Sequence, residues 1–69
     1  MDANDYFKRG KDYFEKENFN EAIADFWKVM EMINDPDKVE KFREKTKKFN
    51  PDVVAMHLMI TLKQVLGVI

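Results

Sequence analysis

The sequence contains no cysteine and only one histidine, His57, among its 69 residues. Disulfide bonds are therefore excluded, and most zinc sites go with them because they use cysteine ligands. A chain shorter than roughly 70–80 residues rarely gains more than about 3–5 kcal/mol of net stability from its core alone. Since disulfides cannot supplement that core, we expect efficient helix packing or self-association to do so.

Glycine and proline are scarce as well, with two of each. No alternating β-type run is bounded by turn residues, and apolar residues recur at spacings of three and four. This period predicts helices throughout, so we expect an all-α chain that forms a single domain over residues 1–69. The four short helices are expected at about residues 2–17, 21–33, 36–48 and 51–67.

Three of these helix starts carry capping residues. Asp35 and Asn50 each stand directly before a proline, Pro36 and Pro51. An Asx side chain can cap the free N–H groups, and proline suits the first helical position because no N–H partner is needed there. Asn20 is expected to cap the second helix in the same way.

Neither sign of charge dominates, since the formal net charge is −1. Residues 1–35 hold nine acidic and five basic residues, whereas residues 36–69 hold four acidic and seven basic ones. This polarity suggests head-to-tail contacts or a charged partner; the ordinary alternative is two solvated faces. Because acids interleave with the lysines of the third predicted helix, we expect no nucleic-acid partner.

Long hydrophobic runs are also missing. Residues 53–69 are fewer than the roughly 20 needed to span a membrane, and His57, Lys63 and Gln64 interrupt them. The start of the sequence lacks the basic segment followed by an apolar core that is typical of a secretory signal. We therefore expect no membrane partner and a cytoplasmic location, with which the lack of cysteine is compatible.

Little in the sequence suggests catalysis. No nucleophile and orienting group can be assigned to complete a catalytic set with His57. We therefore interpret His57 as a structural or surface residue. Glu15, Glu17, Glu21 and Asp25 gather near a predicted turn, but they lack the spaced loop of a calcium site and are expected to form a solvated face. We expect no enzyme, no metal and no cofactor.

The last two predicted helices differ in their apolar faces. The third has only the narrow stripe of Val39, Phe42 and Thr46, so it should lie on the surface. The fourth is apolar around most of its circumference and needs covering on more than one side. The apolar end, Val68 and Ile69, suggests either a fragment of a longer protein or a self-association surface.

Methionine and tryptophan allow two interpretations. Trp27, Met30, Met56 and Met59 stand at helical spacings and are expected in the core. Flexible methionines can also make an adaptable binding surface, which is the alternative.

Small and aromatic residues recur at fixed spacings in the first two predicted helices. Small side chains suit a close helix crossing, and aromatic rings fill the space beside it. The residues are Tyr6, Gly10, Tyr13, Ala22 and Phe26, with Phe19 at the turn. This pattern resembles the tetratricopeptide repeat family over residues 4–34, although Arg9, Glu17 and Val29 depart from it.

The resemblance implies a helical hairpin over residues 1–34, an α-α superhelix, and peptide binding along the first helix. Residues 35–69 would then be a degenerate second repeat or capping helices. The partner-binding residues implied by the resemblance are Asn4, Phe7, Lys11 and Phe14. The alternative is that the rings of Phe7 and Phe14 pack as core.

We therefore expect a non-catalytic protein–protein interaction module, a scaffold or adaptor whose partner is a protein or peptide. Binding would use those first-helix residues or the apolar outer face of the fourth helix. Two alternatives remain open. One is a self-associating structural unit, a homodimer through the C-terminal helix, and the other is a helical subunit or appendage of an enzyme complex.

Overall fold

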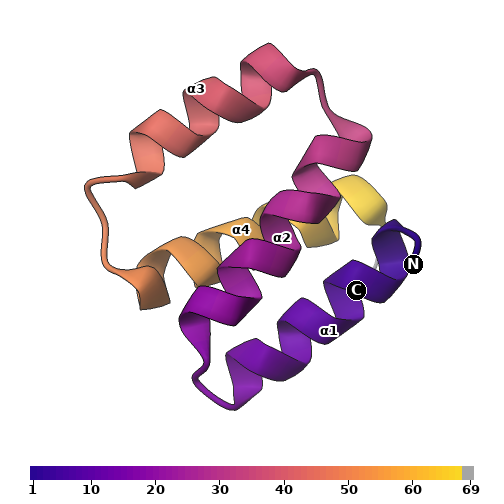
Figure 1. The fold of residues 1–69 in the computed structure, drawn as a ribbon, viewed down its shortest axis with the longest axis vertical. Helices are drawn as coiled ribbons and strands as arrows, with labels where there is room; N and C mark the ends of the chain where they lie inside the picture. The colour runs from indigo at the N-terminus through magenta and orange to yellow at the C-terminus, as the bar shows by residue number, and fades with distance from the viewer. Residues whose placement is uncertain (68–69) are drawn as a thin grey trace.

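The computed structural model describes residues 1–67 and contains four α-helices and no strand within them. They are α1 (Ala3–Glu15), α2 (Phe19–Ile33), α3 (Pro36–Thr46) and α4 (Pro51–Leu66) (Figure 1). The all-α prediction is confirmed. The expectation built on Val68 and Ile69 concerns residues outside those described.

The first two helices form an antiparallel hairpin with a very short connection (Figure 1). The amide of Asn18 donates to the carbonyl of Tyr13 at 2.9 Å, and the amide of Glu17 donates to that of Phe14 at 3.0 Å. These are the two hydrogen bonds of a Schellman motif. Glu17 takes the left-handed conformation that this motif needs, with φ 63°.

The predicted start of the second helix is wrong by two residues. α2 begins at Phe19, and its N-terminal flanking residue is Asn18, which makes no side-chain capping bond. Because the Schellman motif ends at Asn18, the next helix can begin at once. Asn20 therefore lies inside the first turn of α2 and does not cap it.

α1 and α2 approach most closely at Gly10. A Cβ built on Gly10 would lie 2.5 Å from Cε1 of Phe26, far inside an ordinary van der Waals contact. Ala22 and Phe26 have no exposed surface, and the ring centroids of Phe7 and Phe26 lie 5.7 Å apart. The expected close crossing of small residues, flanked by aromatic rings, is confirmed.

α4 closes the core from the other side of α2. It runs behind α2 in Figure 1 and packs mainly against it, with lighter packing against α1. Its inward-facing residues are buried among those of α2. They are Val54, Ala55, Leu58 and Leu62.

α3 lies at the edge of this core and packs against α2 through few side chains (Figure 1). Val39 is buried, and the half-buried ring of Phe42 meets Trp27 edge-on at 5.7 Å between centroids. The guanidinium of Arg43 lies 4.9 Å from the Trp27 ring centroid and also pairs with Glu31 at 3.2 Å. The predicted surface position of this helix is confirmed.

The two proline-marked helix starts are confirmed, since α3 begins at Pro36 and α4 at Pro51. Asp35 caps as expected, because its Oδ1 accepts from the amide of Asp37 at 2.9 Å. The capping expected of Asn50 is wrong, since it makes no side-chain capping bond. Proline suits the start of α4, and Oδ1 of Asp52 in the first turn accepts from the amide of Val53 at 2.8 Å.

Candidate functional site

One face of α4 is apolar and uncovered. Its exposed residues recur at spacings of three and four, and Phe49, just before the helix, extends the row. Each of these side chains is between 40% and 57% exposed. We call this row the α4 stripe, and it consists of Phe49, Val53, Met56 and Ile60.

The α4 stripe contains a methionine that was expected in the core. Met30 is buried and Met59 and Trp27 are half-buried, but Met56 is exposed, so the expectation for Met56 is wrong. The reason is that α4 has a single core-facing side, toward α2, and Met56 lies opposite to it. Methionine side chains are flexible, and exposed ones such as Met56 can adapt their shape to a binding partner.

A hollow of about 460 Å³ lies between α3 and α4, next to the α4 stripe. Its wall is mainly apolar, and the ring centroids of His57 and Phe42, two of the residues that line it, lie 5.7 Å apart. We call this the α3–α4 hollow. It is lined by Phe42, Lys45, Thr46, Lys48, Phe49, Val53, Val54 and His57.

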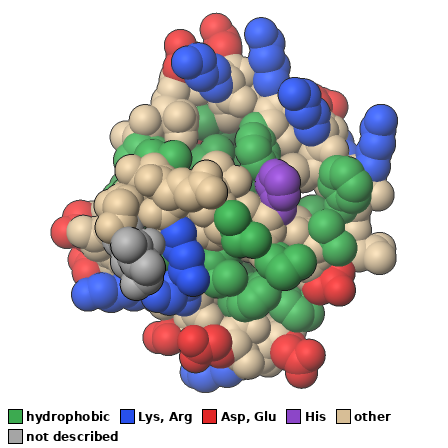
Figure 2. Space-filling model, turned by 180° about the vertical axis from the view of Figure 1, so that it is seen from behind, with side chains coloured by type: hydrophobic (Ala, Val, Ile, Leu, Met, Phe, Trp, Pro, Cys, Tyr) green, Lys and Arg blue, Asp and Glu red, His purple; other side chains and the backbone are tan. Residues whose placement is uncertain are grey.

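The charged residues beside the hollow are cationic. Lys45 and Lys48 line it, and no acidic residue does. Among residues 1–67, neither lysine belongs to an ion pair, whereas Arg43 pairs with Glu31 and Lys47 with Glu44 at 2.9 Å. Figure 2 shows this side of the molecule, with hydrophobic side chains around the histidine and Lys and Arg side chains along the adjoining edge.

The four residues that the family resemblance assigned to a partner do not form an open patch. Phe7 is only 2% exposed and belongs to the core. Phe14 is half-buried and meets Phe19 edge-on at 5.5 Å between centroids. The ammonium of Lys11 lies 5.4 Å from the centroid of the Phe7 ring, while Asn4 is exposed. Their role in binding stays a prediction.

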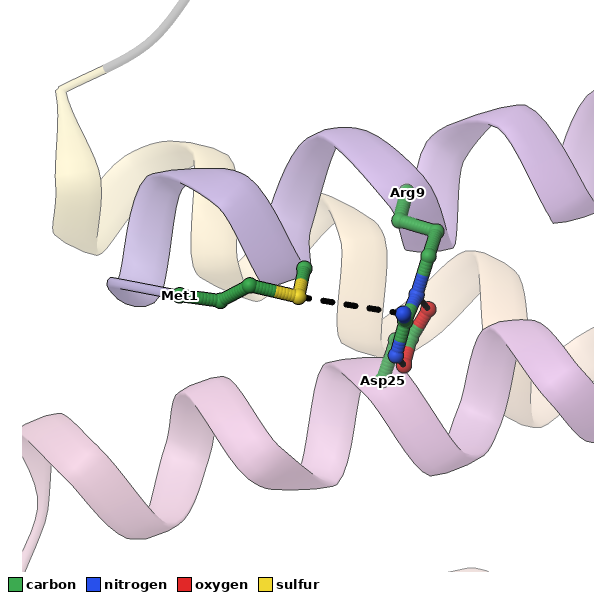
Figure 3. Close-up of polar contacts among 3 residues, drawn as sticks. All are labelled: Met1, Arg9 and Asp25. Atoms are coloured by element: carbon green, nitrogen blue, oxygen red, sulfur yellow. Dashed lines mark hydrogen bonds and ion pairs between the residues drawn. The ribbon is translucent and has the colours of Figure 1, made fainter.

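An ion pair between α1 and α2 was not predicted. Arg9 donates from Nε to Oδ2 and from Nη2 to Oδ1 of Asp25, both at 2.8 Å, and its Nη1 lies 3.7 Å from Sδ of Met1 (Figure 3). The hydrogen bond to Asp25 raises the pKa of Arg9 above its usual value. Because Asp25 is only 5% exposed, its expected place on a solvated face is wrong.

The sequence does carry a signal for this pair. Arg9 precedes Gly10 and Asp25 precedes Phe26. A close crossing of Gly10 over Phe26 therefore brings the two preceding residues near each other. A paired, bidentate guanidinium explains how the carboxylate can be buried.

Other kinds of site are not found in the part of the chain that is described. No three His, Cys, Asp or Glu side chains of residues 1–67 gather where they could hold a metal ion. None of the four helices is both long enough and apolar enough to cross a membrane.

Comparisons with protein-family models, with curated proteins and with solved structures find no match to this chain. The resemblance to tetratricopeptide repeats therefore stays a prediction.

Proposed function

We propose that the chain is a non-catalytic protein-interaction module, a scaffold or adaptor with a tetratricopeptide-like first hairpin, that binds a protein partner through the α4 stripe. The observation that carries this proposal is the exposure of four large apolar side chains in one row, three of them on one face of α4 and Phe49 just before it. Soluble proteins rarely expose contiguous apolar surface without a use for it, and such patches commonly mark interaction sites.

The α4 stripe suits a partner better than the first helix does. The ring of Phe7 already fills the core beside Phe26, and Phe14 packs against Phe19. A partner on α1 would therefore meet mainly polar side chains. On α4, Met56 and Ile60 present large apolar surface without any rearrangement of the fold.

Site-specific photocrosslinking in the cells that make the protein would test the proposal. A photoreactive side chain at Met56 or Ile60 should give a discrete crosslinked species, whereas the same group at Met32 should not. Met32 is a matched control because it is equally exposed but lies on α2. Equal crosslinking at all three positions, or none, would count against the α4 stripe. The identity of a crosslinked protein would also separate an adaptor from a subunit of an enzyme complex.

A second candidate function, a homodimer, is favoured by the geometry of the same stripe. Val53, Met56 and Ile60 follow the i, i+3, i+7 pattern by which two helices pair around a twofold axis. Sedimentation equilibrium of the chain over a wide concentration range would test it. A dimer that is lost in Met56→Glu, together with a Tm that rises with concentration, would support self-association. A monomer at every concentration would exclude it.

The proposal places the module in the cytoplasm. The absence of cysteine from the sequence is compatible with a reducing compartment. Fractionation of the cells that make the protein would test this location, and recovery in a secreted or membrane fraction would contradict it.

A further inference from the structure

We propose that the partner presents an acidic amphipathic helix, with one apolar side chain seated in the α3–α4 hollow and carboxylates paired with lysines of α3. This inference rests on the proposed function and specifies the chemistry of the partner. Its elements are a recessed apolar site and, beside it, a row of lysines that form no ion pair within residues 1–67.

The hollow is suited to an apolar anchor. Its volume of about 460 Å³ falls within the range of pockets that hold small ligands, about 300–1,000 Å³. Phe42, which is half-buried, contributes from α3, and Val54, which is buried, contributes from α4. Phe49 and Val53 line the hollow and also belong to the α4 stripe. A helix lying on the stripe would thus bring one side chain to the hollow.

The cations form a row at helical spacing. They follow each other at intervals of three, four and three residues, and those nearest the hollow have no ion-pair partner among residues 1–67. At a rise of 1.5 Å per residue the three lysines within α3, Lys38, Lys41 and Lys45, extend about 10 Å, which is close to two turns of helix, and Lys48 follows the end of the helix at Thr46. We call it the lysine row, and it consists of Lys38, Lys41, Lys45 and Lys48.

The charges beside the α3–α4 hollow favour an acidic helix as the partner. A helix with carboxylates along one edge and an apolar residue beside them matches the lysine row and the hollow at once. A nucleic acid is disfavoured because the chain has no excess of basic residues, with a formal net charge of −1, and because the hollow beside the lysines is mainly apolar and does not suit a phosphate. A membrane surface is disfavoured because it is flat and leaves the recessed hollow unfilled.

Selection from random 16-residue peptides displayed on phage would test the inference on the full chain. The selected peptides should be rich in Asp and Glu and contain a large apolar residue. A synthetic copy of a selected peptide should lose about tenfold in affinity for the variant Lys45→Glu/Lys48→Glu. The affinity should also fall as salt is added, because exposed charges are screened.

Two control variants separate charge from apolar contact. Lys8→Glu/Lys28→Glu makes the same change in net charge at exposed lysines of α1 and α2, and it should leave the affinity unchanged. Phe49→Ala should weaken binding, whereas Met32→Ala, at a similarly exposed residue elsewhere, should not. Circular dichroism of each variant would show that the fold is kept.

The other outcomes overturn the inference in distinguishable ways. Selected peptides that are neutral or basic, and whose binding Met56→Glu still abolishes, would leave the α4 stripe as a docking surface and remove the acidic partner. Peptides that bind Lys45→Glu/Lys48→Glu as well as the original chain would do the same. Binding to phosphatidylserine vesicles but to no peptide would replace a protein partner by a membrane, and no binding to either probe would also reject the inference.

Discussion

The hairpin of α1 and α2 and the third helix are attached to the same core in different ways. In the hairpin, the ring of Phe26 packs against the backbone of α1 at Gly10, and Arg9 donates two hydrogen bonds to the buried carboxylate of Asp25. α3 is attached mainly through Val39 and through Phe42 at the edge of Trp27. We therefore expect the hairpin to have less freedom to rearrange than α3.

This difference bears on function. Regions with few buried contacts open more easily than the core, and binding surfaces are commonly found there. The α3–α4 hollow lies on the lightly attached side, with Phe42 as its wall toward α2. A small movement of α3 would widen or narrow the hollow without disturbing the hairpin.

Phe26→Ala should have the largest effect. Removing a fully buried phenylalanine costs about 3–5 kcal/mol, which is as much as a core of this size normally provides. The variant is expected to be largely unfolded in urea titrations followed by circular dichroism. Phe49→Ala is the matched control, because that ring is exposed and its loss should change the free energy of unfolding by no more than about 0.5 kcal/mol. Similar losses in the two variants would contradict the assigned core.

The Arg9–Asp25 pair should respond asymmetrically. Arg9→Ala leaves a carboxylate that is 5% exposed without a partner, whereas Asp25→Ala leaves a guanidinium whose side chain is half exposed and can be hydrated. Arg9→Ala should therefore destabilise the fold more than Asp25→Ala. Lys8→Ala, next to Arg9 but unpaired within residues 1–67, is the control. A double-mutant cycle in urea would measure the coupling, and equal single losses would show that burial of Asp25 is unimportant.

Phe42→Ala should release α3 but keep the rest of the fold. The ring is half-buried, so we expect a loss of about 1–3 kcal/mol, below that of a fully buried phenylalanine. Hydrogen exchange should accelerate in α3 and change little in α1 and α2. Val39→Ala, one turn away on the same face, should act in the same direction. Uniform acceleration along the chain would show that α3 is an integral part of the core.

Much of this architecture follows from periodicity and from proline. The four helices, the close crossing at Gly10 and the surface position of α3 were predicted because each depends on local pattern. Asn20 was misplaced because Asn18 and Asn20 are equally good capping residues, and only the hydrogen bonds of the turn decide between them.

The candidate site was harder to predict because it depends on which helix faces remain uncovered. The excess of apolar residues in α4 was evident, but Met56 was assigned to the core because the orientation of α4 against α2 is a tertiary property. The α3–α4 hollow depends on the angle at which α3 leaves α2 (Figure 1). The spacing of apolar residues within a single helix does not predict that angle.

Glu17→Gly should have the smallest effect and the opposite sign. Glu17 stands at φ 63°, where a residue with a Cβ is strained and where glycine is the usual residue of a Schellman motif. We expect a gain of about 1 kcal/mol in the free energy of unfolding, measured by urea titration. Lys8→Gly, at an exposed residue in the middle of α1, should instead lose about 1 kcal/mol, because glycine is a poor helix former. Glu17 lies in the connection between the two tightly packed helices, so a gain in the free energy of unfolding would mean that the hairpin can be made still more stable than the attachment of α3. A loss would show that the carboxylate itself stabilises the turn.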